Sequence, residues 1–186
     1  MESFRAGMVL ALVACSTAPI RLDERALADA SREENVATPS NGANTPGVIW
    51  LMAVDDSRVD QTLGIVGGRP VSAGNLRDWL GRELTARASR WGVAWGRTAP
   101  PGARVAMRLW LRKAVVSSVS TTLTAAVVVE VEVGPPGGVF ARRFHRGQAT
   151  ALNWASGEGE IADAFRTALE KCLDEVVTDM VAQVGG

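Results

Sequence analysis

Cys15 is the residue whose chemistry is defined most clearly by its neighbours. It follows Leu12, Val13 and Ala14 at the end of a short apolar run, and the small Ala14 fits a peptidase pocket that admits only small side chains. This is the pattern of a lipobox, where a bacterial signal peptide is cut and the thiol of the new N-terminal cysteine is acylated. The apolar run is far shorter than the roughly 20 residues that a membrane-spanning helix needs. The alternative, a buried helix with an incidental cysteine, is disfavoured by the polar stretch that follows. We therefore expect a lipoprotein signal peptide at 1–14 and a lipid on Cys15.

Three carboxylates form the next candidate, since Asp55, Asp56 and Asp60 lie within six residues of each other. Such a cluster could bind a cation or carry acid–base chemistry. However, the stretch lacks the glycine and the distal glutamate of a calcium-binding loop. Arg58 lies among the three and would more simply form an ion pair, with Asp56 as its partner in an Asp56-x-Arg58 motif. We expect a structural loop, and an enzyme that uses these three aspartates remains the less favoured alternative.

Nucleophilic catalysis has little support in the sequence. The single histidine, His145, lies between Arg143 and Arg146, whose positive charges would lower its basicity, and there is no Gly-x-Ser-x-Gly motif. Cys172 falls on the apolar stripe of a predicted helix, where a thiol packs as a small hydrophobic group. With Cys15 acylated, Cys172 also has no intramolecular disulfide partner. We expect no catalytic residue, no metal site and no cofactor.

A basic and aromatic set forms the third candidate. Arg104, Arg108, Trp110 and Arg112 alternate with apolar residues, so they project from one side of a predicted strand. Guanidinium groups recognise phosphates and carboxylates, and a tryptophan can stack beside them. This face is a candidate for binding an anionic envelope ligand or an acidic protein. The alternative is a solvated sheet face with cross-strand ion pairs, in which Glu130 lies opposite Arg142 or Arg143.

Charge is distributed unevenly along a chain whose formal net charge is zero. Residues 61–146 hold 13 Lys and Arg against 4 Asp and Glu, whereas residues 147–186 hold 2 against 7. The first predicted helix is basic and the last is acidic, so the two would complement each other if they lay side by side. Nucleic acid is a poor partner for an exported protein, whatever its local charge.

Hydrophobic periodicity predicts the elements that position these residues. They are a buried strand at 48–54, a glycine-containing loop with Gly64, Gly67, Gly68 and Pro70, a helix capped by Ser72 or Asn75 and stopped by Gly92, a short strand at 93–95, strands at 103–116, 118–133 and 139–154, and a long helix with an apolar stripe from Ile161 to Val181. The last strand is expected to be bulged or at an edge. The economical arrangement is an α+β, two-layer sandwich, a mainly antiparallel sheet of about four or five strands with two amphipathic helices on one face.

The domain organisation follows from composition. Residues 15–46 carry Pro19, Pro39 and Pro46 and lack a sustained apolar face, which predicts a flexible tether that reaches roughly 30 Å. Residues 47–186 have the length and apolar content of a single α+β domain.

The layout resembles a known group of proteins. Asp56-Ser57-Arg58 follows the first strand, Gly64 lies in the next loop, the first helix ends near Gly92, and Ile161-Ala162-Asp163-Ala164 opens the last helix. With the lipobox, this is similar to the YajG-like family of bacterial envelope lipoproteins. The accessory lipoproteins of lipid-transport ABC systems share the general layout and are a second candidate. Either resemblance implies an exported lipoprotein domain with no catalytic residues to carry over.

These observations predict an outer-membrane lipoprotein that faces the periplasm and serves as a non-enzymatic adaptor or binding module. Ser16 rather than aspartate follows the cysteine, which is consistent with sorting to the outer membrane. The expected partners are the membrane, through the lipid on Cys15, and an envelope protein or anionic envelope ligand. A subunit of a larger transport or assembly machine is the main alternative.

Overall fold

The computed structural model describes residues 18–23, 27, 49–89, 92–154 and 157–184. The predicted signal peptide and Cys15 lie outside these residues. The elements in chain order are β1 (Ile20–Leu22), β2 (Ile49–Asp56), β3 (Thr62–Val66), β4 (Arg69–Ala73), α3 (Leu76–Arg87), β5 (Val93–Trp95), β6 (Val105–Val119), β7 (Thr122–Gly134), β8 (Ala141–Leu152) and α4 (Glu158–Val184).

Long antiparallel strands form the centre of the fold. β6, β7 and β8 pair as a meander, and β2 joins the other edge of β6 in parallel, giving the order β5-β2-β6-β7-β8. Apolar residues alternate along β6 and β7, so one face of this sheet is almost entirely buried. β8 is an edge strand, as its irregular pattern predicts. The loop between β7 and β8 contains Gly137, which takes the left-handed conformation there (φ +76°).

A β-bulge at Arg112 shifts the alternation along β6. Leu111 pairs with Val129 and Lys113 with Val128, which leaves Arg112 as the extra residue. The core face therefore changes from odd to even positions beyond the bulge, and Ala114 is buried there.

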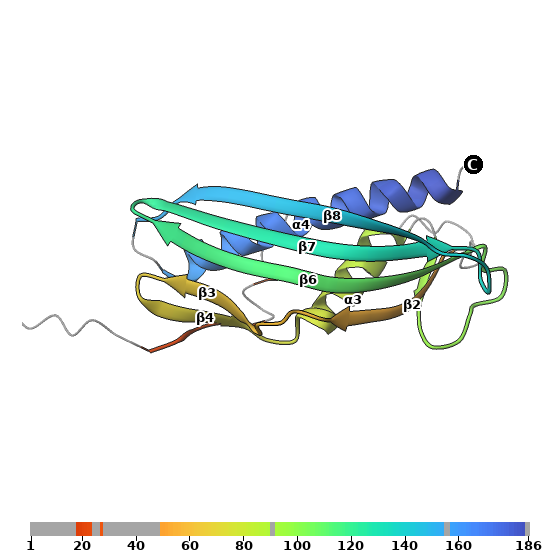
Figure 1. Ribbon diagram of the computed structural model, residues 1–186, viewed down its shortest axis with the longest axis horizontal. Helices are drawn as coiled ribbons and strands as arrows, with labels where there is room; N and C mark the ends of the chain where they lie inside the picture. The colour runs from red at the N-terminus through yellow and green to blue at the C-terminus, as the bar shows by residue number, and fades with distance from the viewer. Residues whose placement is uncertain (1–17, 24–26, 28–48, 90–91, 155–156, 185–186) are drawn as a thin grey trace, which may run out of the picture.

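Both helices cover the buried face of the five-stranded sheet (Figure 1). α4 packs mainly on β7 and β8, and α3 packs on β2 and β5. Of the two predicted caps, Asn75 is the one used, since its side chain accepts a hydrogen bond from the Asp78 amide. The helices meet through Arg87, which pairs with Asp174 at 2.6 Å and Glu170 at 3.6 Å. The predicted fold class, an α+β two-layer sandwich, is confirmed.

A second sheet has three strands in the order β1-β4-β3, and its strands β3 and β4 lie where a loop was predicted. Gly67 and Gly68 have positive φ angles (+56° and +76°), so they form a tight turn that reverses the chain between β3 and β4. Gly64 lets β3 approach β6 closely, because a Cβ at this position would lie 2.4 Å from the Val116 carbonyl oxygen. The glycines that indicated a loop in fact build a hairpin.

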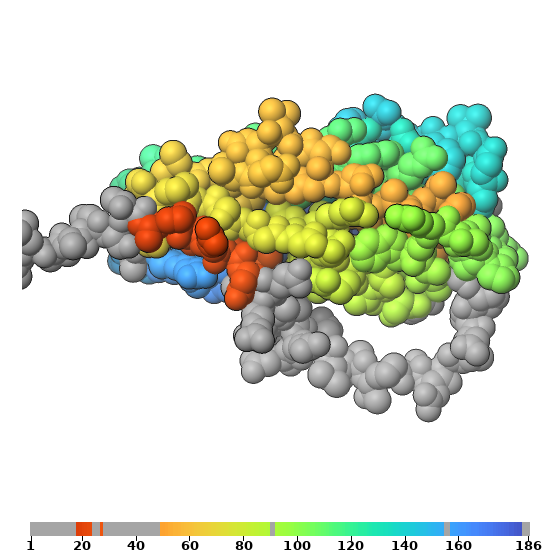
Figure 2. Space-filling view, turned by 90° about the horizontal axis from the view of Figure 1, so that it is seen from below, coloured from red at the N-terminus to blue at the C-terminus, as the bar shows by residue number. Residues whose placement is uncertain are grey.

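The prediction that residues 15–46 are a flexible tether is wrong at β1. Ile20–Leu22 pairs in parallel with β4, and the side chains of Ile20, Leu22 and Leu27 are almost completely buried. β1 lies against both β4 and α4, as Figure 2 shows. The folded domain therefore begins by Ile20 and not at residue 47.

The core fills the space between the sheet and its helices. Phe165 is its largest fully buried side chain, and leucines, valines and alanines supply most of the rest. Among the described residues, no helix is both long enough and apolar enough to cross a membrane.

Candidate functional site

The face of the five-stranded sheet that the helices leave uncovered carries three of the four residues of the predicted basic and aromatic set. We call it the open sheet face and define it by eight residues of β6, β7, β8 and the loop before β8: Arg108, Trp110, Arg112, Glu130, Glu132, Phe140, Arg142 and Phe144. Neighbouring strands lie about 4.8 Å apart, so side chains from three strands meet on this face.

Glu130 lies at the centre of the open sheet face and is only 3% exposed. Its Oε2 accepts a hydrogen bond from Arg112 Nε at 2.6 Å, and its Oε1 pairs with Arg142 Nε at 2.9 Å. A buried carboxylate is stable only when it is paired, so these two guanidinium groups balance its charge.

Glu132 continues the same network along β7. Arg142 Nη2 donates to its Oε1 at 3.0 Å, and Arg108 Nη1 lies 3.6 Å from its Oε2. Three guanidinium groups therefore share two carboxylates, which leaves one net positive charge on this cluster. The guanidinium groups are the outer layer, since the side chains of Arg108, Arg112 and Arg142 are 43%, 39% and 59% exposed.

The strand register corrects one expectation. Glu130 lies opposite Phe144, and Arg142 lies opposite Glu132. The prediction that an arginine is directly opposite Glu130 is therefore wrong, although Arg142 still reaches Glu130 diagonally. Diagonal neighbours on adjacent strands are within reach of a long side chain.

Aromatic rings lie between the arginines. The Arg112 guanidinium lies 5.7 Å from the centre of the Trp110 ring, and that of Arg108 lies 5.2 Å from the centre of the Phe140 ring. Both distances are within the range of cation–π attraction. Phe144 is 63% exposed on the same face, a large amount for a phenylalanine.

Arg104 lies apart from this network. It precedes β6 and lines a hollow of about 230 Å³ with Pro135 and Gln183. The structure therefore brings together three of the four predicted residues, Arg108, Trp110 and Arg112. Arg142 and Phe144 also belong to the open sheet face, which the β6 pattern alone could not show.

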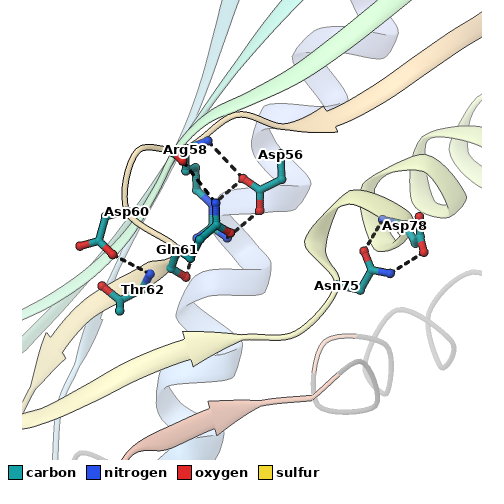
Figure 3. A network of polar contacts seen from close by, with 7 residues as sticks. All are labelled: Asp56, Arg58, Asp60, Gln61, Thr62, Asn75 and Asp78. Atoms are coloured by element: carbon teal, nitrogen blue, oxygen red, sulfur yellow. Dashed lines mark hydrogen bonds and ion pairs between the residues drawn. The ribbon is translucent and has the colours of Figure 1, made fainter.

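The Asp56–Arg58 loop connects β2 to β3 (Figure 3). Arg58 is 7% exposed and forms a two-pronged ion pair with Asp56, with Nε–Oδ1 at 2.9 Å and Nη2–Oδ2 at 2.7 Å. Its Nη1 and Nη2 also donate to the Gln61 backbone oxygen (3.4 Å) and side-chain oxygen (3.3 Å). The predicted ion pair is present, and it lies in the segment that links β2 of one sheet to β3 of the other.

The three aspartates of this stretch have separate roles. Asp60 accepts a hydrogen bond from the Thr62 amide at 2.8 Å, and Asp55 lies on β2 beside Trp110 in the strand register. Partial burial would raise the pKa of Asp56, but the hydrogen bonds and charge of Arg58 outweigh it and lower the pKa below its ordinary value. Within the described parts of the chain, no three histidine, cysteine or acidic side chains are grouped as metal ligands would be.

His145 faces α4 beside a groove of about 740 Å³ between β8 and that helix. Its Nε2 lies 3.4 Å from Asp179 Oδ2, and Arg143 pairs with the same carboxylate. Cys172 is buried next to it, with Sγ 3.5 Å from the His145 backbone oxygen. Burial raises the pKa of the Cys172 thiol to about 12, so it stays protonated and packs in the core.

No protein-family model and no curated protein matches this chain. Among solved structures, a Xanthomonas campestris protein of the family DUF330 is similar at a TM-score of 0.51 and 12% identity, covering 71% of this chain and 81% of that one. An uncharacterized protein matches at a TM-score of 0.50 and 9% identity, covering 73% and 93%. A putative lipoprotein from Caulobacter crescentus matches at 0.41 and 13% identity, covering 58% and 83%, a score too low to bear on the fold. At these identities the first two matches show a shared fold alone.

Proposed function

We propose that this protein is an outer-membrane lipoprotein, anchored through Cys15, whose periplasmic domain is a non-enzymatic adaptor. The lipobox and the resemblance to YajG-like envelope lipoproteins support the anchor. The open sheet face supports binding, since it combines arginines with three aromatic rings, of which Trp110 and Phe140 are half-buried and Phe144 is exposed. The Asp55, Asp56 and Asp60 stretch gives the enzyme alternative little support, because Arg58 occupies the Asp56 carboxylate.

The cluster of three guanidinium groups over two carboxylates is the observation that carries this proposal. Glu130 and Glu132 hold Arg108, Arg112 and Arg142 in fixed positions, so less side-chain entropy is lost when a partner binds. Arginine and tryptophan are also the residues that contribute most to protein interfaces. The face therefore suits an acidic segment of another envelope protein, whose carboxylates would take up the remaining positive charge.

The binding proposal predicts that Arg108→Gln with Arg112→Gln loses the partner in pull-downs from detergent-solubilised envelopes. Losing two charged interface contacts should weaken binding by about 2 kcal/mol or more, or at least thirtyfold. Arg77→Gln with Arg97→Gln, which changes two exposed arginines elsewhere, is the control for the change in charge, and thermal unfolding checks that the first double variant remains folded when Glu130 keeps only one of its two arginine partners. An unchanged partner in the first double variant would refute the role of the open sheet face. Recovery of a second copy of this chain alone would instead indicate a subunit of a larger assembly.

Lipidation has its own test. The membrane-extracted protein should carry a diacylglyceryl group on Cys15 by mass spectrometry, and Cys15→Ser should leave the protein unacylated and outside the membrane fraction. A wild-type protein that is unmodified and absent from membranes would refute the anchor.

A further inference from the structure

The N-terminal segment enters the fold at one end of the sandwich. β1 runs parallel to β4, and just before it the Ala18 carbonyl accepts a hydrogen bond from Arg69 Nε at 2.8 Å. Arg69 is the first residue of β4, directly after the Gly67-Gly68 turn. The chain therefore reaches the domain beside this turn, at the left in Figure 1.

Two other connections lie at the same end. The Gly67 amide donates to Ser118 Oγ at 3.4 Å, which places the β3–β4 turn beside the end of β6. The Asn153 amide donates to the Thr121 carbonyl at 2.8 Å, which places the end of β8 beside the β6–β7 turn. α4 begins there as well (Figure 1). We call this the N-terminal end of the sandwich.

Apolar side chains are exposed at the N-terminal end. Ile65 is 64% exposed, Val119 76%, Leu152 62% and Trp154 79%. They come from four places in the chain, namely β3, the end of β6, the end of β8 and the segment after it. These four are half of the eight large hydrophobic residues that are exposed in the described parts of the chain. Apolar groups gathered on a surface indicate contact with a protein or a membrane.

The position of Cys15 favours contact with a membrane over contact with a protein. It precedes Ala18 by three residues, which can span at most about 11 Å even when fully extended. A lipid on Cys15 would therefore hold the N-terminal end near the bilayer surface. We propose that the N-terminal end is a membrane-contacting surface, on which Ile65, Val119, Leu152 and Trp154 enter the lipid interface. This inference rests on the lipidation of Cys15 proposed above.

The chemistry of the N-terminal end fits shallow contact with a bilayer. The indole of tryptophan prefers the boundary between lipid and water, because it combines a large apolar ring with a polar N–H group. The exposed Glu158 and the partly buried Glu160 at the start of α4 would be repelled by a strongly anionic surface. Zwitterionic phosphatidylethanolamine is therefore the expected main component of the contact.

Such contact would also orient the domain. The long strands run from the N-terminal end along the longest axis of the molecule (Figure 1). With this end on the membrane, the sheet would stand away from the surface, and the open sheet face would be accessible from the side. The domain would then lie at the membrane surface and would not be held away from it by the long tether that the sequence predicts.

A fluorescent label tests the contact in the full-length, membrane-extracted protein. Val119→Cys places a thiol at the N-terminal end, and Val139→Cys places a matched thiol in the β7–β8 loop, where Val139 is 90% exposed. Acylated Cys15 and buried Cys172 should not react, so a nitrobenzoxadiazole label marks one site in each variant. After reconstitution into vesicles of phosphatidylethanolamine and phosphatidylglycerol, the label at 119 should shift to shorter wavelength and be quenched by doxyl-labelled lipid. The label at 139 should show neither effect.

The outcomes separate this inference from the anchor. A diacylglyceryl group on Cys15 together with equal quenching at 119 and 139 would overturn the membrane contact and leave the anchor standing. Absence of the modification would overturn both. Leu152→Ser with Trp154→Ser in the Val119→Cys background should reduce the quenching at 119, and unchanged quenching would also count against the contact. The midpoint of thermal unfolding of each variant should match that of the wild type, because all the replaced side chains are exposed.

Discussion

Replacing Gly147 with alanine is expected to lower the free energy of unfolding by at least about 3 kcal/mol, the upper range for an overpacked core. Gly147 lies in β8 directly under α4. A Cβ at this position would lie 1.8 Å from the Ala168 carbonyl oxygen and 2.7 Å from the Cys172 amide nitrogen. Both atoms belong to the helix backbone, so no side-chain movement can relieve the clash. Either α4 would move away from β8 or the strand would distort. Urea unfolding followed by circular dichroism would measure the loss.

The matched control for Gly147 is Gly159→Ala. Gly159 lies in the first turn of α4, and a Cβ there would meet no atom within 4 Å. Alanine is favoured over glycine in a helix by up to about 1 kcal/mol, so this variant should be as stable as the wild type or slightly more stable. Equal stability of the Gly147→Ala variant and the wild type would show that the helix does not pack this closely.

Periodicity in the sequence predicted the layers because long elements repeat the same pattern many times. Leu123 to Val133 alternate over eleven residues, and the apolar stripe of α4 runs from Ile161 to Met180. Over such lengths, burial of one face outweighs local preferences. The two helices, the meander and their common face therefore followed from the sequence.

Short elements could not be predicted in the same way. Ile20–Leu22 has only three residues, and its two buried side chains do not distinguish a strand from a coil. Its structure depends on pairing with β4, which lies about 50 residues later in the chain. The Arg112 bulge is similar, because only the pairing with β7 shows where the extra residue falls.

The candidate sites differ in the same way, because one is formed by local contacts and the other by strand pairing. The Asp56–Arg58 pair is local, so its spacing alone indicated it. Arg142 and Phe144 join the open sheet face through the β7–β8 register, which a sequence pattern does not determine. The same register places Arg142 within reach of both Glu130 and Glu132.

Arg58→Ala should produce the second large effect, a loss of about 3 kcal/mol or more in the free energy of unfolding at neutral pH. The side chain of Arg58 is 3% exposed, and that of Asp56 is 17% exposed. Removing the guanidinium group leaves a largely buried carboxylate without its partner and takes away the hydrogen bonds to Gln61. Arg77→Ala on the exposed side of α3 is the control and should change stability by less than about 0.5 kcal/mol.

The effect of Arg58→Ala should depend on pH in a direction that follows from Asp56. Arg58 lowers the pKa of Asp56 in the folded protein, so the pair stabilises the fold fully above the pKa of the unfolded chain, about 3.9. This stabilisation is lost as the pH falls through the lower, folded-state pKa.

In the variant, burial without Arg58 raises the pKa of Asp56, so protonation relieves the unpaired charge. The difference in unfolding free energy between wild type and variant should therefore shrink as the pH falls from the raised pKa of Asp56 in the variant, above about 4, to its lowered pKa in the wild type. The pKa of Asp60 is also lowered, mainly by its hydrogen bonds with Thr62, which both proteins keep, so most of its contribution cancels from the difference. Urea titrations of both proteins at neutral and acidic pH would measure the difference in unfolding free energy. A difference independent of pH would show that the ion pair does not supply the stability.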